Sequence, residues 1–400
     1  MKSLLLPNQS ASAAATLDDF LNFRAYVMGG ADSRRGANAK ADADAQDSLL
    51  ATVDGVELSA MWTEFNQTIA MWNAQRDALV NLLTFDLTKE SETVRVPIES
   101  DFEEASEFGV PKGITQGNPY RFGFTFKWWD LAIRYTWRFL LDATADELRA
   151  LNNNAMEADN RLMFTRVMRQ VFNNSGATAI VNTETLNVYP FYNGDSMVPP
   201  KWKNTTHTTG HDHYLVSGAS TVDSGDLDDM VAHMTHHGYS PTKGHRMVLL
   251  VNEQEGDVIR TLSVGGGDKY DFIPGPAYGG GVYKQVGDLV AAPAMAQFSG
   301  LNTIGTYGPL VIVEENYIPA GYMFAFVTGG EGSISNPVGL RNHQRPEMKG
   351  LRLVQGPVAK YPLQESYYLH GFGTGVRHRG AGVVMQVKAS GSYDIPSAYA

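Results

Sequence analysis

The sequence predicts an α+β fold organised around one long helix, and three observations support this prediction. A helical pattern extends over residues 142–174. Two segments that alternate apolar and polar residues, at 84–98 and 122–128, precede it as half-buried strands would. After the helix, short helical and strand-like segments follow one another, which is typical of a separate α/β lobe.

The long helix is expected because apolar residues recur at intervals of three and four behind a start signal. Thr144 and Glu147 form the T-x-x-E capping-box pattern. The apolar stripe comprises Leu148, Leu151, Ala155, Ala158 and Leu162, and then Phe164, Val167, Met168, Val171 and Phe172. Asn173, Asn174 and Gly176 are expected to end the helix. At 1.5 Å per residue it would be roughly 45 Å long, and we expect it to act as a spine.

The two strands before the helix are expected to form an extended hairpin. The segment that joins them is acidic at first and then rich in glycine and proline. A connection of this length is uncommon inside a compact domain and usually serves function or forms an interface. We therefore expect the hairpin to extend away from the body of the protein.

The remaining elements follow from shorter patterns. Residues 29–48 contain no aromatic or branched aliphatic side chain and predict a flexible arm or linker. Further helices are predicted over residues 11–29, 57–83 and 226–237. Further strands are predicted over residues 247–252, 309–314, 323–327 and 382–387.

Composition limits the function classes. The 400 residues exceed what one hydrophobic core usually serves, so two or three lobes are expected. The formal charge of −11 argues against nucleic acid as the main partner, because phosphate binding needs an excess of Lys and Arg. The chain has no cysteine, which excludes disulfides and thiolate sites. It has no apolar run of the roughly 18–20 residues that span a bilayer, so no membrane partner is expected.

A glycine-rich stretch near the end, YYLHGFGTGVRHRGAGVVMQV, resembles a phosphate-binding loop at first sight. Gly371, Gly373 and Gly375 alternate in it, but His378 stands where the last glycine of a dinucleotide fingerprint belongs, and no helical pattern follows. We interpret these glycines as a bulge or a close backbone approach in a long strand. No cofactor is expected.

The histidines are the only group that suggests chemistry. Seven of the ten lie between His207 and His245, and the candidate metal ligands among them are His211, His213, His233, His236 and His237. The last three are spaced i, i+3, i+4 on the predicted 226–237 helix, as metal ligands can be. The glutamate of an H-E-x-x-H motif is absent. Surface histidines with no metal are therefore the favoured interpretation, and a metal-dependent enzyme is the alternative from another class.

Three segments carry a resemblance to a known family. They are DFEEASEFGVPKG at 101–113, WWDLAIRYTWRFLLDATADELRALNNNAMEADNRLMFTRVMRQVFNN at 128–174, and LQESYYLHGFGTGVRHRGAGVVMQVKASGSYDIPSAY at 363–399. In this order they resemble the major capsid proteins of tailed bacteriophages, which share the Hong Kong 97 (HK97-like) fold. The resemblance covers roughly residues 60–400, and the ordered set carries it, since no single motif is specific.

The resemblance implies a four-part organisation. It consists of an N-terminal arm (1–75), an extended loop or E-loop (76–140), a peripheral domain that holds the spine helix and long strands (141–199 and 335–400), and an α/β axial domain (200–334). The implied function is structural rather than enzymatic. Copies would form pentamers and hexamers of an icosahedral head that encloses double-stranded DNA, which the shell contacts non-specifically.

The resemblance also implies partners and a location. A separate scaffolding protein and a portal are expected, with assembly in the bacterial host cytoplasm and a final place in the virion. The expected inter-subunit contacts are apolar and acidic residues of the loop tip and two arginines: Phe102, Phe108, Val110, Glu103, Glu104, Glu107, Arg134 and Arg138. An encapsulin-like compartment shell is the alternative within the same fold.

Overall fold

The computed structural model describes residues 51–74, 78–95, 102–105, 107–110, 113, 119–181, 183–275, 297–298, 301–356 and 362–400. The helix expected over 11–29 and the arm expected over 29–48 lie outside these residues. The chain divides into two compact units. The first takes residues up to Ile69 together with Leu131–Ala155 and Leu353–Tyr368, and the second takes Ala70–Asp130, Met156–Arg352 and Leu369–Ala400.

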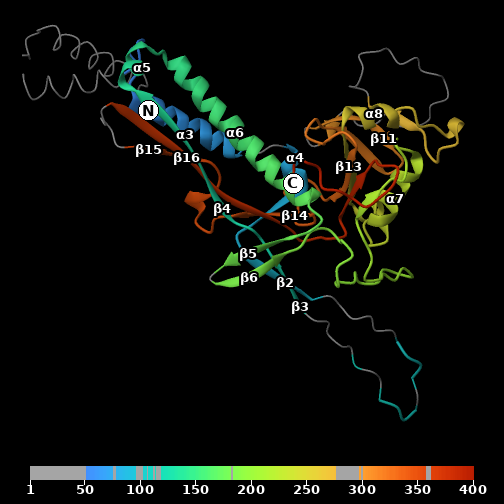
Figure 1. Cartoon of the computed structure of the whole chain (residues 1–400). Helices are drawn as coiled ribbons and strands as arrows, with labels where there is room; N and C mark the ends of the chain where they lie inside the picture. Colours follow the sequence, from blue (N-terminus) through green and yellow to red (C-terminus); the bar gives the residue numbers. More distant parts are fainter. Residues whose placement is uncertain are drawn as a thin grey trace, which may run out of the picture. The chain divides into compact units, whose positions relative to one another are not determined.

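The elements confirm an α+β composition. The helices are α3 (Leu58–Ala74), α4 (Ala78–Leu83), α5 (Trp137–Asp142), α6 (Ala145–Phe172), α7 (Ser224–Thr235) and α8 (Glu253–Ile259) (Figure 1). The first strands are β1 (Thr84–Leu87), β2 (Ser91–Arg95), β3 (Pro119–Gly123), β4 (Lys127–Thr136), β5 (Ala177–Val181), β6 (Glu184–Val188), β7 (Tyr214–Val216) and β8 (Arg246–Val251). The later strands are β9 (Phe272–Pro274), β10 (Gln297–Phe298), β11 (Leu301–Tyr307), β12 (Leu310–Glu314), β13 (Tyr322–Thr328), β14 (Val338–Asn342), β15 (Arg352–Gln355), β16 (Leu363–Val376) and β17 (Gly382–Gln386). No helix among the described residues is long and apolar enough to cross a membrane.

The predicted long helix is confirmed as α6, together with its start signal. The Thr144 backbone N–H donates to Glu147 Oε2 at 3.0 Å, and the Glu147 N–H donates to Thr144 Oγ1 at 3.4 Å. Beyond the helix, the Asn173 amide donates to the Gly176 carbonyl at 3.2 Å. Gly176 has φ +70°, a left-handed conformation that favours glycine after a helix end.

The buried face of α6 differs from the predicted stripe at two turns. Leu151 is 36% exposed, whereas its neighbour Asn152 is 2% exposed. Asn152 is buried because its side-chain oxygen accepts a hydrogen bond from the Tyr368 hydroxyl at 2.7 Å. Two helical turns later, the buried Asp159 carboxylate lies 2.6 Å from His370 Nδ1. Leu151 was therefore placed wrongly, because polar partners on β16 set the face here.

In the first unit, side-chain hydrogen bonds and buried apolar side chains stabilise the described segments. Arg149 on α6 forms two hydrogen bonds with the Glu64 carboxylate of α3, at 2.7 and 3.0 Å. The Thr136 hydroxyl caps α5 by accepting from the Phe139 N–H at 3.0 Å. Buried Met61, Trp62 and Phe65 form the apolar side of α3. The helix predicted over 57–83 is thus confirmed as α3 and α4, with residues 75–77 outside the described part.

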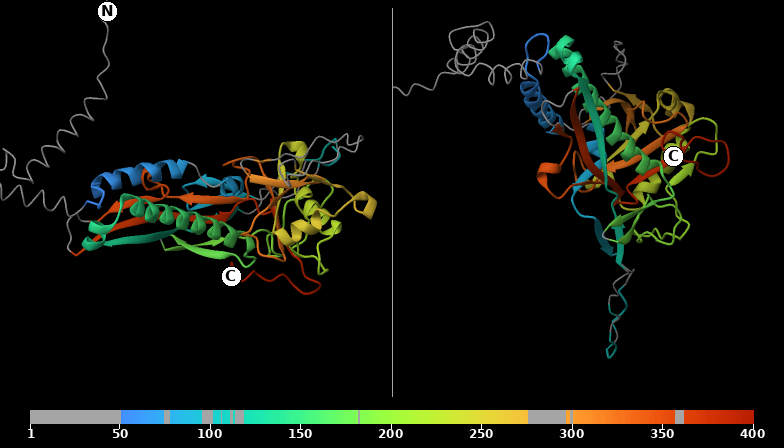
Figure 2. Two further views of the ribbon diagram at one scale, coloured as in Figure 1. Left: turned by 90° about the horizontal axis from the view of Figure 1, so that it is seen from above. Right: turned by 60° about the vertical axis from the view of Figure 1, so that its left-hand side comes forward.

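In the second unit, an eight-stranded sheet carries apolar side chains on both faces. The strand order is β10-β11-β12-β8-β13-β17-β7, with β9 on β11. Figure 2 shows the later strands of the chain in orange and red. In β8, Met247, Leu249 and Val251 belong to one apolar cluster, which α7 and α8 also enter. Val248 and Leu250 belong to the other, together with α4 and the end of α6. The continuous apolar run MVLLV is explained because both faces of this strand are covered.

The expected hairpin exists, but its strands are offset from the prediction. β2 and β3 pair antiparallel, from Ser91 opposite Gly123 to Arg95 opposite Pro119. The single strand predicted over 84–98 is divided, because β1 leaves to pair in parallel with β14. The strand predicted over 122–128 spans the end of β3 and the start of β4. Residues between β2 and β3 are described only in part.

For the glycine-rich stretch at 367–387, the expected close backbone approach is confirmed at Gly373. A Cβ at Gly373 would lie 1.6 Å from the Thr125 carbonyl oxygen, and one at Gly371 would lie 2.5 Å from the Trp128 ring. The bulge alternative is wrong for the stretch that pairs with β14, because the register runs unbroken from Val338 opposite Val376 to Asn342 opposite Phe372. The motif is structural.

Candidate functional site

The histidine cluster is the described site with the most distinctive chemistry, and two segments of the second unit build it. His207, His211 and His213 lie in the loop that leads into β7. His236 is the residue that caps the C-terminal end of α7, and His237 follows it. Gly238 then turns the chain away with φ +87°. The histidines of the two segments thereby meet.

The start of α7 is set by a reciprocal capping box. Asp223 Oδ1 accepts from the Asp226 N–H at 3.0 Å, and Asp226 Oδ2 accepts from the Asp223 N–H at 3.1 Å. Burial raises the pKa of Asp226 to about 6, and the negative charges of Asp223 and Asp229 add to the rise. The Asp226 carboxyl group therefore keeps its proton to a higher pH in the folded chain than in the unfolded chain.

Replacing Asp226 with asparagine is expected to stabilise the fold at pH 8 by about 1–3 kcal/mol and to change little at pH 4. The reason is that the folded pKa of Asp226 lies above its unfolded value of 3.8. The aspartate's contribution to the free energy of unfolding is present below pH 4 and is lost as the pH rises through 6. Urea unfolding of both chains at the two pH values measures this. The exposed Glu253 in the first turn of α8, as Glu253→Gln, is the control and should change little at either pH. Equal effects of Asp226→Asn at pH 4 and pH 8 would contradict the prediction.

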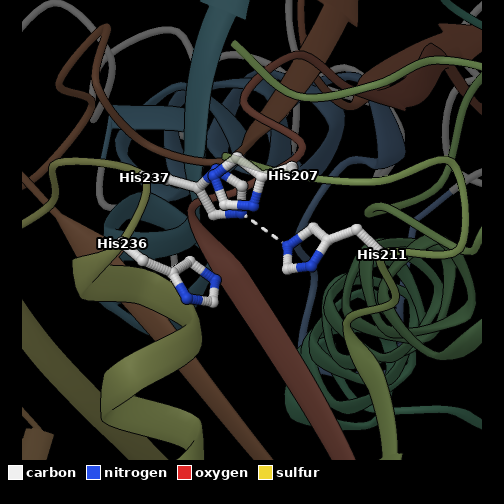
Figure 3. Close-up of side chains that lie close together, drawn as sticks. All are labelled: His207, His211, His236 and His237. Carbon is white, nitrogen blue, oxygen red and sulfur yellow. Dashed lines mark hydrogen bonds between the residues drawn. The ribbon is translucent and has the colours of Figure 1, made fainter. Parts of the chain in front are cut away.

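Three ring nitrogens of the cluster lie in mutual contact. The Nε2 atoms of His211 and His213 are 3.0 Å apart, and each lies 2.9 Å from His237 Nε2. Figure 3 shows His211 and His237 facing each other, with His236 turned toward the same space. The ring of His207 stacks on that of His237, with centroids 4.5 Å apart. Among the described residues, His207, His211, His236 and His237 form a group whose ligand atoms all lie within 4.8 Å of one another.

The cluster is neutral near pH 7. Burial lowers the pKa of His211 and of His236 to about 4 and that of His237 to about 2, and the neighbouring histidines lower them further. Burial also holds the pKa of His213 well below its usual range. Imidazoles that stay neutral keep a lone pair, which is the form that binds a metal.

The structure corrects the favoured interpretation of these residues as surface histidines. His213 is fully buried, and its Nδ1 donates to the Gly382 carbonyl of β17 at 2.7 Å. Of the predicted i, i+3, i+4 set, His233 lies within α7, which ends at Thr235, and is half-buried, with Nδ1 on the Asp229 carbonyl at 2.8 Å. Its ring centre lies 5.1 Å from that of His236, so the structure places it beside the cluster. His207 was not among the candidate ligands. Its signal was the H-x-x-x-H spacing to His211.

The candidate contact residues of the extended loop are exposed. Phe102, Phe108 and Val110 have relative exposures of 107%, 91% and 92%. Glu103, Glu104 and Glu107 are exposed as well. Arg134 and Arg138 belong to the first unit, and the loop belongs to the second. Arg134 lies 3.3 Å from Glu365 of its own chain, and Arg138 is exposed on α5.

A cavity of about 300 Å³ in the second unit is lined in part by basic side chains. Lys127, Arg166 and Arg169 line it, and the Arg166 guanidinium lies 4.2 Å above the Trp129 ring. Burial lowers the pKa of Arg166, and the nearby Arg169 adds to this. The cavity is a basic feature in an otherwise acidic chain.

Comparison with solved structures includes a strong match. A solved chain from Mycobacterium phage Patience is 40% identical, with a TM-score of 0.70, over 88% of this chain and 94% of that one. The capsid of a native GTA particle is 13% identical with a TM-score of 0.45, over 78% and 91% of the two chains. The SrpI encapsulin from Synechococcus elongatus is 12% identical with a TM-score of 0.43, over 79% and 90%. No protein-family model and no curated protein matches the chain.

The phage match covers most of both chains at an identity that establishes common ancestry. The encapsulin match is too distant to favour the alternative of a bacterial compartment. The chain therefore belongs to the major capsid proteins of tailed bacteriophages with the HK97-like fold, and its role is that of a structural shell subunit of the virion.

Proposed function

We propose that this chain assembles as pentamers and hexamers into an icosahedral head that encloses double-stranded DNA. The observation that carries the proposal is the apolar tip between β2 and β3, where Phe102, Phe108 and Val110 are almost fully exposed in the single chain. Exposing several large apolar side chains together costs free energy unless another surface covers them. A neighbouring copy of the chain is the occupant we propose.

Acidic residues surround this apolar tip, and they support a polar rim to the same contact. Glu103, Glu104 and Glu107 alternate with the apolar residues, and all three are exposed. We propose that they face Arg134 and Arg138 of the neighbouring copy. Exposed ion pairs of this kind contribute little each, roughly 0–1 kcal/mol. Many weak contacts allow a misplaced subunit to leave, while their number makes the closed shell durable.

Assembly in the host cytoplasm with a scaffolding protein and a portal completes the proposal. The net charge of −11 also suits a wall that contacts DNA without specific binding, because it limits adhesion to the packaged phosphates. Negative-stain electron microscopy with light-scattering mass tests the assembly. Closed shells, or rings of five and six subunits, are the expected result. A monomer that persists when the scaffolding protein is co-expressed would overturn it.

The double variant Phe102→Ser, Phe108→Ser is expected to abolish shells while leaving the thermal unfolding temperature of the subunit unchanged. The reason is that neither side chain is buried in the single chain, so only the contact between copies is lost. Sedimentation velocity and calorimetry measure the two quantities. Ile180→Ser is a matched control, because Ile180 is 78% exposed but lies on β5, outside the loop.

Charge reversal tests the proposed pairing of the arginines in the same assembly assay. Glu104→Lys should reduce shell yield, and adding Arg138→Glu should restore it, because the swapped pair regains its opposite charges. Rescue supports the proposed pairing. Shells that form equally well in the single variant, or no recovery in the double variant, would remove these arginines from the contact and leave the apolar contact to be judged by the serine variants.

A further inference from the structure

The histidine cluster has contacts that hydrogen bonding alone does not satisfy. A neutral imidazole nitrogen is either a donor or an acceptor, so at most two of the three contacts among His211, His213 and His237 Nε2 can be hydrogen bonds. His213 Nδ1 must carry its proton, because its partner is the Gly382 carbonyl, which only accepts. His213 Nε2 is therefore a lone pair in the neutral ring. At least one of the three contacts therefore joins two like groups, either two donors or two lone pairs, at 2.9–3.0 Å.

A cation resolves this conflict, because all three nitrogens then present lone pairs to one centre. Ligand nitrogens about 2.0–2.1 Å from a metal lie about 3.3 Å apart in tetrahedral geometry and about 3.0 Å apart in octahedral geometry. The observed separations of 2.9–3.0 Å match a facial set of three ligands to within a few tenths of an ångström.

Two more imidazole nitrogens lie near these three. The Nε2 atoms of His207 and His236 are buried and have no hydrogen-bond partner among the described residues. Both residues belong to the group whose ligand atoms lie within 4.8 Å of one another, together with His211 and His237. Unpartnered buried polar atoms are costly, and a shared ion would give them a partner.

We propose that His211, His213 and His237 bind one divalent transition-metal ion, with His236 or His207 as a further ligand. All-imidazole sites suit zinc, nickel, cobalt and copper rather than calcium or magnesium, which prefer oxygen ligands. We take Zn²⁺ as the occupant to test. The role that we propose for the ion is structural, because it would join the loop before β7 to the C-terminal end of α7.

Neighbouring residues hold two of the proposed ligands, His213 and His237, in place. The hydrogen bond from His213 Nδ1 to Gly382 fixes the ring tautomer and orientation, as second partners of metal-bound histidines do. The ring of Tyr192 packs on His237 with centroids 5.3 Å apart and an interplanar angle of 21°. The ion would thus tie the loop before β7 to the C-terminal end of α7 and to β17. This inference does not depend on the proposed assembly.

Zinc binding to the full-length chain tests the proposal. After purification, chelation and gel filtration, titrated Zn²⁺ should bind at one ion per chain and raise the unfolding temperature by about 5 °C or more. His211→Gln and His237→Gln should each lose the shift, and Co²⁺ added to the wild type should give visible d–d absorption that both variants lack. His245→Gln is the control and should behave as wild type.

Each outcome decides the question. His211 and His237 are partly exposed, so these variants should fold, and their circular dichroism spectra confirm it. If they do not fold, the wild-type titration decides, since a chain with no Zn²⁺-dependent shift and no stoichiometric binding overturns the proposal. Zinc that binds equally to the folded His211→Gln, His237→Gln double variant would be adventitious and would overturn it as well.

Discussion

Replacing Arg379 with methionine is expected to lower the free energy of unfolding by about 3–5 kcal/mol. The guanidinium is almost fully buried, and its side chain is 1% exposed. Its Nε donates to the Pro190 carbonyl at 2.8 Å, and Nη2 donates to the Phe191 carbonyl and to Asn193 Oδ1, both at 3.1 Å. Nη2 also lies 2.9 Å from Asp195 Oδ2. Methionine fills a similar volume but leaves these acceptors, one of them charged, without their donor.

The flat guanidinium, rather than its charge alone, should account for most of the effect. Its carbon lies 4.6 Å from the centre of the Tyr192 ring, the same ring that packs on His237. Arg379→Lys keeps the charge but cannot reach four acceptors in one plane, so we expect it to recover less than half of the loss. Urea unfolding followed by tryptophan fluorescence measures each variant.

An exposed arginine provides the matched control for this prediction. Arg161 on α6 lies 3.8 Å from Glu157, and both side chains are more than half exposed. Arg161→Met should change the free energy of unfolding by less than about 0.5 kcal/mol, as is usual for i, i+4 pairs. Similar losses for Arg379→Met and Arg161→Met would mean that the buried network contributes nothing beyond a surface ion pair.

The sequence predicts the spine helix well because its signals are local. Thr144 and Glu147 are three residues apart, and the capping bonds they form are those the pattern indicates. The apolar periodicity identifies the second half of the helix, from Met163 to Phe172, which is buried in one cluster. The first half was less predictable, because Asn152 and Asp159 are buried by Tyr368 and His370, which are distant in sequence.

The candidate metal site shows the same limit. His211 and His213 stand two apart in extended chain, a spacing that places both side chains on one side, and this signal is readable. That His237 would meet them depends on where α7 ends and on how β7 aligns with β17. Such non-local pairings leave no mark on a single sequence. The helical spacing of His233, His236 and His237 therefore suggested a different set.

Gly373→Ala is expected to destabilise the chain by at least about 3 kcal/mol, because the added methyl group would meet backbone rather than a movable side chain. A Cβ there would lie 1.6 Å from the Thr125 carbonyl oxygen and 2.2 Å from its carbon. Thr125 cannot withdraw cheaply. Its N–H donates to the Thr374 carbonyl at 3.1 Å, and its hydroxyl accepts from the Thr374 N–H at 2.9 Å.

The neighbouring glycine separates this backbone clash from a general intolerance of alanine in β16. At Gly371 the nearest atoms belong to the ring of Trp128, which is 45% exposed and can move, so Gly371→Ala should cost clearly less than Gly373→Ala. Gly265 has nothing within 4 Å of an added Cβ, and Gly265→Ala should be close to neutral. Denaturant midpoints of the three variants give the ranking. Equal losses at Gly371 and Gly373 would contradict the prediction. They would show that strand β16 as a whole, rather than the approach of Thr125, excludes side chains.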